Sequence, residues 1–365
     1  MSHVGAKAPL VLGIETSCDD TACAVLDADG RVLASVVSSQ IAHRPYGGVV
    51  PEIASREHLR NWPTVSERAL EVAGVDLGDV DLVAATRGPG LIGSLLVGLS
   101  LGRSIAYALE RPFFAVHHLE GHLFSPFLAE TEAAAEVPER FVGLVVSGGH
   151  TALFDVAAGD ASTLAQTRDD AMGECFDKVA KRLGLPFPGG PWLDRLAEGG
   201  DASRHPFRIA RCGDTLDFSY SGLKTQALTE IETLERDGIE TALRVEEGRV
   251  LATEGEPPQP LLDLLAGFRQ AAVGQLLDRV ERLRRGRGVE RLAVSGGAAA
   301  NRLLRRELEG WAKGVGVAVD LVPLVYSGDN AAMIAWAALL RHRRGETGHD
   351  GEVEAASRIP LGTAT

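Results

Sequence analysis

The feature that most constrains the fold is a strand–turn–strand unit that occurs twice in the chain. The first copy is PLVLGIETSCDDTACAVLD (residues 9–27), and the second is FVGLVVSGGHTALFDVA (residues 141–157). Each joins two short apolar runs through a turn rich in Gly, Ser, Thr or Asp, which is typical of two buried strands in a hairpin. Further apolar runs, VDLVAAT (80–86) and RLAVS (291–295), each precede a Gly-rich turn and a helical pattern. The repetition predicts two related α/β halves.

The composition indicates a globular protein with a sizeable core. At 365 residues, 45% of them apolar, the chain can fill more than one core. We find no apolar run that approaches the roughly 18 to 20 residues needed to cross a bilayer, and the first residues lack a secretory or transit pattern. The cysteines show no CxxC pair and no disulfide-like spacing; they are Cys18, Cys23, Cys175 and Cys212. We therefore expect a cytoplasmic protein with no membrane partner.

The charge balance argues against a chain that wraps nucleic acid by itself. The 37 Lys and Arg residues are outnumbered by 50 Asp and Glu residues, so the formal net charge is −13. Affinity for nucleic acid comes mainly from neutralised phosphates, which an acidic surface disfavours. Basic residues do cluster at 279–291 and 341–345. These clusters are interpreted either as solvated helix faces or as local basic patches.

The segment VHHLEGHLFSP (116–126) holds three His residues and one Glu in an otherwise apolar stretch. In a helix, His118 and His122 lie on one face about a turn apart, which suits two ligands of one metal ion. His117 points about 100° away and is a poorer ligand. The glutamate does not stand where an HExxH metalloprotease needs it. From this segment alone the histidines are either metal ligands or satisfied core or surface residues.

Two aspartates stand at positions where they can bind a ligand. Asp329 precedes the apolar helical pattern NAAMIAWAALL and fits a third metal ligand and a helix N-cap equally well. Asp177 lies in a short helix before a Pro-Gly-Gly turn, where a carboxylate can accept hydrogen bonds from sugar hydroxyls. The alternative for this second segment is a charged surface helix followed by a turn.

The Gly-rich turns suggest an anion site. ETSCDDT (15–21), VSGGHT (146–151) and VSGGAAANR (294–302) follow apolar runs, and Asn301 lies near the start of the next helix. Such turns can direct backbone N–H groups towards a phosphate. The sequence has no GxxxxGK[ST] and no strand–GxGxxG–helix unit, so neither a Walker-type NTPase nor a Rossmann enzyme is indicated. Each turn taken alone can equally be an ordinary tight turn.

Nine segments resemble, in order, the motifs of one family. They are GIETSCDDT, GGVVPEIASREH, ATRGPGLIGSLLVG, HHLEGH, VSGGHT, GECFDKVAKRLGLPFPGGP, DFSYSGLKT, VSGGAAANR and DNAAMIA. This order is similar to that of the TsaD family, the tRNA N6-adenosine threonylcarbamoyltransferases once described as O-sialoglycoprotein endopeptidases. The resemblance spans roughly residues 10 to 340. GGVVPEIASREH and the PGGP turn are similar to the bacterial and organellar branch of the family rather than to the archaeal one, and we expect a bacterial protein.

The resemblance implies an α/β, two-lobed fold of the actin, Hsp70 and sugar-kinase (ASKHA) superfamily. That fold consists of two duplicated RNase H-like α/β domains with a cleft between the lobes. We expect an N-terminal lobe of residues 1–111, on which the C-terminal helix 329–345 packs. We expect a C-terminal lobe of residues 112–328, with a surface insertion near 232–260. The polar segment 129–139 is also expected to be a surface insertion.

The resemblance also implies an activity and a set of site residues. Family members transfer the threonylcarbamoyl group from threonylcarbamoyl-AMP to N6 of adenosine 37 in tRNAs that read ANN codons, and release AMP. The implied cofactor is one Fe²⁺ per chain, with Zn or another divalent metal possible in vitro, held by His118, His122 and Asp329. The implied substrate-binding residues are Val145, Val146, Ser147, Gly148, Gly149, Asp177, Gly190 and Asn301. No general base follows from the resemblance.

The implied partners are tRNA and threonylcarbamoyl-AMP, a paralogue resembling TsaB, and a small ATPase resembling TsaE. Partners that carry basic surface would compensate for the acidic charge of this chain. Three other functions remain open at this point. They are a small-molecule kinase or carbamoyltransferase of the same superfamily, a metalloprotease, and a non-catalytic scaffold with a vestigial nucleotide site.

Overall fold

The computed structural model describes residues 9–46, 48–130, 132–253, 255–349, 351 and 353–361. The N-terminal residues 1–8, on which the expectation of no targeting pattern partly rests, lie outside these ranges. The chain forms two compact units. The first unit is Met1–Pro138 with Val322–Thr365, and the second unit is Glu139–Leu321.

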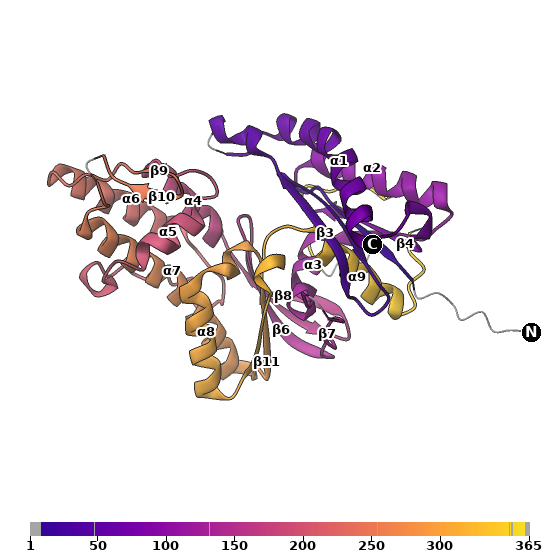
Figure 1. The fold of residues 1–365 in the computed structure, drawn as a ribbon. Coiled ribbons are helices and arrows are strands. Elements are labelled where there is room, and N and C mark those ends of the chain that lie inside the picture. The colour runs from indigo at the N-terminus through magenta and orange to yellow at the C-terminus, as the bar shows by residue number, and fades with distance from the viewer. Residues whose placement is uncertain are drawn as a thin grey trace, which may run out of the picture. The chain divides into compact units, whose positions relative to one another are not determined.

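The first unit contains a five-stranded mixed sheet with the order β3-β2-β1-β4-β5 (Figure 1). Its strands are β1 (Val11–Glu15), β2 (Asp20–Leu26), β3 (Val32–Ser39), β4 (Leu82–Gly88) and β5 (Phe113–His117). The first three form an antiparallel meander, whereas β4 and β5 run parallel to β1. The carboxyl ends of β1, β4 and β5 therefore lie at the same edge of the sheet.

Helices cover both faces of this sheet (Figure 1). The long helices α1 (Pro51–Ala73) and α2 (Ile92–Leu109) pack on one face, where Leu12 and Ile14 of β1 join their apolar core. The opposite face carries α9 (Ala331–Arg343), which also contacts the short helix α3 (His118–Phe124).

Side-chain alternation along β1 decides which face Glu15 occupies. Gly13 lies directly under α9, because a Cβ atom there would be 2.3 Å from the carbonyl oxygen of Ala331. Successive side chains of a strand point to opposite faces. Glu15, two residues after Gly13, therefore points to the face covered by α9 rather than to the apolar core under α1 and α2.

The second unit repeats the topology of the first. Its five-stranded sheet has the order β12-β11-β6-β7-β8. The strands are β6 (Arg140–Val146), β7 (Thr151–Ala157), β8 (Asp160–Gln166), β11 (Arg291–Ser295) and β12 (Ala318–Leu321). As in the first unit, three strands form an antiparallel meander, and two further strands add in parallel beside the first strand of the meander.

The second unit is largely helical outside its sheet. Its helices are α4 (Met172–Arg182), α5 (Gly190–Ala197), α6 (Ser221–Arg236), α7 (Gln259–Arg287) and α8 (Arg302–Val315). The strands β9 (Arg244–Glu246) and β10 (Arg249–Leu251) form a separate two-stranded hairpin. Short 3₁₀ helices in the chain are η1 (Ile41–Tyr46), η2 (Leu77–Asp79), η3 (Ser125–Phe127), η4 (Ala202–Arg204), η5 (Gly297–Ala300) and η6 (Leu324–Tyr326).

The predicted duplication of the α/β unit is confirmed by these two matching sheets. The boundary expected after residue 111 falls inside the first unit, because β5 pairs with β4 and carries residues 112–138 with it. An apolar strand pattern does not say which of two sheets the strand joins, and this explains the difference. The segment 232–260, expected to be a surface insertion, contains the end of α6, the β9–β10 hairpin and the start of α7.

Helix α2 departs from the expectation that no segment is apolar enough to cross a membrane. Its 18 residues have a mean hydropathy of 1.5, so it passes that test by length and composition. Core helices of globular proteins pass the same test, and α2 packs one side against β4 and α1. This property is therefore weak evidence for a membrane span.

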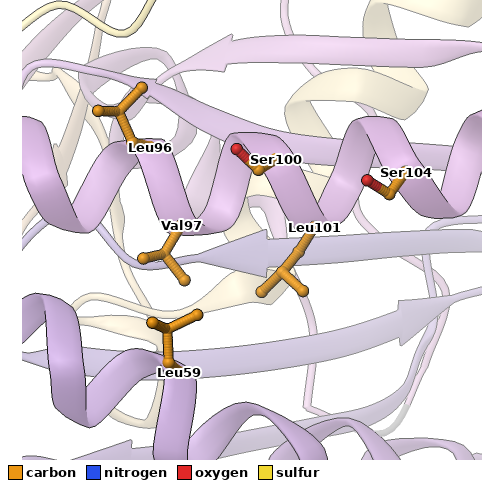
Figure 2. A pocket seen from close by; sticks show the side chains of 6 residues that line it. All are labelled: Leu59, Leu96, Val97, Ser100, Leu101 and Ser104. Carbon is orange, nitrogen blue, oxygen red and sulfur yellow. The ribbon is translucent and has the colours of Figure 1, made fainter.

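The outer side of α2 borders a shallow apolar groove of about 370 Å³ (Figure 2). Figure 2 shows Leu59 of α1 opposite Val97 and Leu101 of α2. Leu59 and Leu96 are more than half exposed. None of the residues that line this groove belongs to the cluster of ionisable side chains described next.

Candidate functional site

Three side chains of the first unit converge as a metal site requires. They are His118 and His122 of α3 and Asp329, which precedes α9; one donor atom from each lies within 4.8 Å of the others. Asp329 Oδ1 is 3.5 Å from His118 Nε2 and 3.2 Å from His122 Nε2. Both rings are buried, whereas the aspartate side chain is 27% exposed. The cluster is thus enclosed on the protein side and accessible at its carboxylate.

The local sequence explains why the two histidines meet. The parallel strand β5 ends at His117, and α3 starts at the next residue, so His118 and His122 fall one turn apart on the same face. Gly121, between them, lets α3 approach α9 closely, because a Cβ atom there would lie 3.0 Å from Ile334 and Met333 side-chain atoms.

The N-terminus of α9 places the third member of the cluster. The N-cap of this helix is Asn330, whose Oδ1 accepts a hydrogen bond from the Met333 backbone at 3.0 Å. Its amide also donates to the carbonyl groups of Tyr326 and Gly328. The capping alternative for Asp329 was therefore wrong by one residue, and the Asp329 carboxylate is directed to the two histidines instead.

The ionised forms of His118 and Asp329 stabilise each other, and this shifts both pKa values. Burial lowers the pKa of His118, but the negative charges of Asp329 and Glu15 outweigh it and raise that pKa well above its usual value. Burial raises the pKa of Asp329, but the charge and hydrogen bond of His118 hold it well below its usual range. Burial lowers the pKa of His122, which favours its neutral, metal-binding form.

The donor set fits a divalent transition metal. Two imidazole nitrogens with one carboxylate oxygen are ligands that Fe²⁺ and Zn²⁺ both accept, and three protein ligands leave coordination positions for substrate or water. Nδ1 of His122 is buried and has no hydrogen-bond partner among the described residues. The nitrogen of His122 that does have a partner, Nε2, is the one that faces Asp329.

His117 has a structural role. Its Nδ1 accepts a hydrogen bond from the Leu119 backbone at 3.1 Å and caps α3. Its Nε2 donates to the carbonyl oxygen of Ile359 at 3.0 Å. Burial lowers its pKa to about 4, so the ring stays neutral. With both nitrogens engaged, His117 is not available as a ligand, in line with the interpretation of the sequence.

Sequence reasoning missed three residues around the cluster, namely Glu15, Ser17 and Thr86. Nδ1 of His118 lies 3.1 Å from Glu15 Oε2 and 3.3 Å from Ser17 Oγ, and Thr86 donates to the same Glu15 oxygen at 2.6 Å. The signal available in the sequence was a single Glu at the end of the apolar run VLGIE, where an unpaired charge would be costly to bury.

The second unit brings together several of the residues expected to bind substrate. Val145 and Val146 end β6, and Ser147, Gly148 and Gly149 form the turn into β7. A Cβ atom added at either glycine would meet no atom within 4 Å, so the turn is open on that side.

The turn after β11 lies beside the turn after β6. At Gly296, where φ is +93°, a Cβ atom would be 2.4 Å from the carbonyl oxygen of Val146. A side chain is excluded here by both the close approach and the left-handed backbone. Two Gly-rich turns thus share one edge of the second sheet, as parallel neighbours β6 and β11 require.

Asp177 and Asn301 are each held by other residues of the second unit. Oδ1 of Asp177 accepts hydrogen bonds from the backbone of Gly189 at 2.7 Å and of Gly190 at 3.2 Å, which fixes the Pro-Gly-Gly turn. Asn301 caps α8 by accepting from the Leu304 backbone at 2.9 Å. Both residues therefore shape the backbone around the turns, whatever else they contact.

Asn301 also belongs to a buried ionic network that the sequence did not suggest. Its amide donates to Asp194 Oδ1 at 2.9 Å, and Arg269 pairs with the same oxygen at 2.9 Å. Asp194, Arg269 and Asn301 are each less than a tenth exposed. The three come from α5, α7 and the start of α8, so no local pattern could have joined them.

The family model and the curated relatives agree on one family. The model of the family "TsaD: tRNA N6-adenosine threonylcarbamoyltransferase" matches residues 31–336. A curated relative of that name from a strain of Thermus thermophilus is 46% identical over 342 residues, with 93% of this chain and 94% of the relative covered. Another, from Pelobacter propionicus, is 48% identical over 330 residues, covering 89% and 90%.

Among solved structures, HypF from T. kodakarensis matches with a TM-score of 0.57 at 15% identity, covering 93% of this chain and 48% of that one. This likeness shows the fold alone, which is of the actin, Hsp70 and sugar-kinase type. The family match covers both units, and the relatives cover nearly the whole chain. The chain belongs to the tRNA N6-adenosine threonylcarbamoyltransferase family.

Proposed function

We propose that this chain transfers the threonylcarbamoyl group from threonylcarbamoyl-AMP to N6 of adenosine 37 in tRNAs that read ANN codons, and releases AMP. The observation that carries the proposal is the match of the family over residues 31–336, together with the cluster of His118, His122 and Asp329. The family name describes a transferase that acts on tRNA. The cluster provides three side chains that suit a metal ion, which supports a metal-assisted transfer.

The reaction is a direct acyl transfer. The N6 nitrogen attacks the carbamoyl carbon, a bond from carbon to a phosphate oxygen breaks, AMP leaves, and N6 loses one proton. Because the acyl phosphate is already activated, the protein chiefly aligns the two reactants and stabilises the charge that develops on the leaving group. No residue is assigned here as the general base.

The metal ligands in this proposal are His118, His122 and Asp329, and the metal is Fe²⁺, one per chain. The buried imidazoles and the partly exposed carboxylate support this assignment. When bound, the ion supplies Lewis-acid polarisation and neutralises negative charge during acyl transfer. The low pKa of Asp329 keeps its carboxylate ionised and able to bind the ion at neutral pH.

The nucleotide in this proposal binds to the second unit. The open turn at Gly148 and Gly149, with Val145, Val146 and Ser147 before it, holds the phosphate or acyl end through backbone groups. Asp177 and Gly190 bind the ribose, and Asn301 binds near the adenine. Oδ1 of Asp177 accepts hydrogen bonds from the backbone of Gly189 and Gly190, which fixes the turn beside the proposed ribose site.

The partners in this proposal are a TsaB-like paralogue and a TsaE-like ATPase, in addition to tRNA. The net charge of −13 supports a need for basic partners, because the chain alone offers little net attraction to RNA. Tight tRNA binding by the isolated chain, with a steep dependence on salt, would remove this reason for a partner. The chain is proposed to act in the cytoplasm, where its tRNA substrates are.

Complementation tests the proposed activity. A bacterial host is depleted of its own enzyme, and this chain is expressed in its place. Threonylcarbamoyladenosine is then measured by mass spectrometry of digested tRNA. We expect the wild-type chain and the surface control Asp160→Asn to restore the modification, and Asp329→Asn not to. Unmodified tRNA in cells that contain folded wild-type chain and compatible partners would overturn the proposal.

A further inference from the structure

Glu15 is a fully buried carboxylate that the proposed reaction does not use. It ends β1 on the face that α9 covers, and its residue exposure is 0%. A buried carboxylate persists only if hydrogen bonds and opposite charge compensate for its lost hydration. The contacts of Glu15 therefore indicate why the chain retains it.

The proton positions around Glu15 follow from the chemistry of its neighbours. Oε1 accepts from the Ser17 backbone N–H at 2.5 Å, and Oε2 accepts from the Thr86 hydroxyl at 2.6 Å. An ionised carboxylate can only accept hydrogen bonds. The 3.1 Å contact between Oε2 and His118 Nδ1 then requires the proton to be on Nδ1.

A proton on Nδ1 leaves the other nitrogen of a neutral His118 ring free to bind a metal ion. That nitrogen, Nε2, is the one that lies 3.5 Å from Asp329 Oδ1. We propose that Glu15 is a positioning residue for the metal centre: its carboxylate fixes the His118 ring and its tautomer so that Nε2 faces His122 and Asp329. This inference rests on the proposed metal site.

His118 and His122 differ in the hydrogen-bond partners of their Nδ1 atoms. Nδ1 of His118 has the Glu15 carboxylate and the Ser17 hydroxyl within reach, whereas Nδ1 of His122 has no partner among the described residues. Outer carboxylates that bind the second nitrogen of a ligand histidine fix its orientation and increase its basicity. His118 is therefore the better oriented ligand, and Glu15 is the residue that makes it so.

Glu15 also has a structural contact that must be separated from this role. Its bond with Thr86 links β1 to β4, and its bond with the Ser17 backbone shapes the β1–β2 turn. Thr86→Val removes this side-chain hydrogen bond, while β1 and β4 stay paired through their backbones and the carboxylate stays beside His118. A purely structural Glu15 would make Thr86→Val and Glu15 variants behave alike.

Glu15→Gln tests this role most directly, because glutamine has the same size but replaces one accepting carboxylate oxygen with an amide group that donates. With its oxygen accepting from the Ser17 N–H, its amide hydrogens point at Thr86 Oγ1 and at His118 Nδ1. All three neighbours then remain satisfied, but His118 must accept at Nδ1. A neutral ring that accepts at Nδ1 carries its proton on Nε2, where it blocks metal binding.

The test measures Zn²⁺ affinity of the full-length chain by competition with a chromophoric chelator. We expect Glu15→Gln to weaken binding by roughly 10- to 100-fold, the range for loss of a carboxylate behind a ligand histidine. The matched control Glu52→Gln makes the same change at an exposed position of α1, and Thr86→Val controls for the strand contact. Both are expected to stay within about 3-fold of wild type.

The outcomes separate this inference from the proposed metal site. If wild type and His122→Ala bind Zn²⁺ equally, the metal site itself is wrong. If His122→Ala loses binding but Glu15→Gln does not, or if Thr86→Val weakens it as much as Glu15→Gln, the role of Glu15 is overturned. Independently of any variant, NMR of the Zn²⁺-loaded wild type must show a hydrogen-bonded Nδ1 proton on His118; its absence also overturns the inference.

Discussion

The two units have the same strand order, but the turn after their first strand has opposite chemistry. In the first unit this turn follows Glu15, contains Asp19 and leads into Asp20 at the start of β2, and its Ser17 lies beside the His118 ring. In the second unit the equivalent turn contains Gly148 and Gly149 and is open on their side. One backbone topology thus presents ionisable side chains in one unit and backbone groups in the other.

The first unit is also the more acidic of the two as a whole. The first unit has 13 Lys and Arg against 22 Asp and Glu, a formal charge of −9, whereas the second has 24 against 28, a charge of −4. Acidic side chains suit a cation, and a less acidic surface with open backbone donors suits an anion. This difference supports the proposal that the metal binds to the first unit and the nucleotide to the second.

The buried ion pair of the second unit, Asp194 with Arg269, is expected to stabilise the fold. Its removal should give the largest loss of stability. Asp194→Ala removes the buried counter-charge of Arg269 and leaves its guanidinium only the partly exposed Glu198 as an ion-pair partner among the described residues. Removing one partner of a buried pair costs about 3–5 kcal/mol. Chemical denaturation should show this loss, whereas the exposed control Asp160→Ala should change the free energy of unfolding by at most about 0.5 kcal/mol. Equal stability of the two variants would contradict a structural role for this network.

In the first unit, a comparable change should affect activity instead of folding. Asp329→Asn keeps the size of the side chain but removes the anionic ligand, so metal binding and the transfer rate should fall by roughly 100-fold or more. The rate is measured with saturating threonylcarbamoyl-AMP and tRNA, and bound metal by mass spectrometry of the purified protein. A wild-type transfer rate and metal content in this variant would contradict the proposal that the first unit binds the metal through Asp329.

The acidic turn should make the stability of the first unit depend on pH. Burial raises the pKa of Asp20 to about 7, helped by the charges of Asp329 and Asp19 and opposed by a hydrogen bond from Ser39. A raised carboxyl pKa contributes stability that is fully present below about pH 4 and lost as pH rises to 7. Asp20→Asn should therefore stabilise the metal-free protein at pH 7 by on the order of 2 kcal/mol, and not at pH 4. A stability difference that is the same at both pH values would contradict this account.

The smallest expected effect concerns the open turn of the second unit. Gly149→Val adds a side chain where no atom lies within 4 Å, so the fold should tolerate it. The added methyl groups should obstruct the approach of a nucleotide phosphate and raise the KM for threonylcarbamoyl-AMP by about 10-fold. By contrast, Gly296→Ala should destabilise the fold by about 1–3 kcal/mol, because φ is +93° there. An unchanged KM in Gly149→Val would argue against nucleotide binding at this turn.

Much of the fold was predictable because its signals are local. The repeated strand–turn–strand pattern predicted the antiparallel hairpins β1–β2 and β6–β7, and the i,i+4 spacing predicted that His118 and His122 share a helix face. The assignment of β5 to a sheet was not predictable, because its apolar run fits either unit. The helix after VDLVAAT was predicted, but its exposed side was not: Leu96 is 52% exposed and Tyr107 is 88% exposed.

The candidate site was predictable only in part, because its contacts join distant positions. Asp329 and His122 are 207 positions apart, and Glu15 and His118 are 103 apart. The sequence offered Asp329 as a ligand or a cap, and only the position of Asn330 at the helix start decided between them. Glu15 could be noticed as a charge in an apolar strand, but its partner could not.

Removal and return of the metal tests the central claim most directly. The purified chain, with its partners, tRNA and threonylcarbamoyl-AMP, is assayed by mass spectrometry for threonylcarbamoyladenosine before chelation, after chelation, and after addition of Fe²⁺. We expect the modification to form, to be lost, and to return in the wild type, and not to return in Asp329→Asn. Full activity of the chelated wild-type chain, verified to contain no metal, would contradict a metal-assisted transfer by His118, His122 and Asp329.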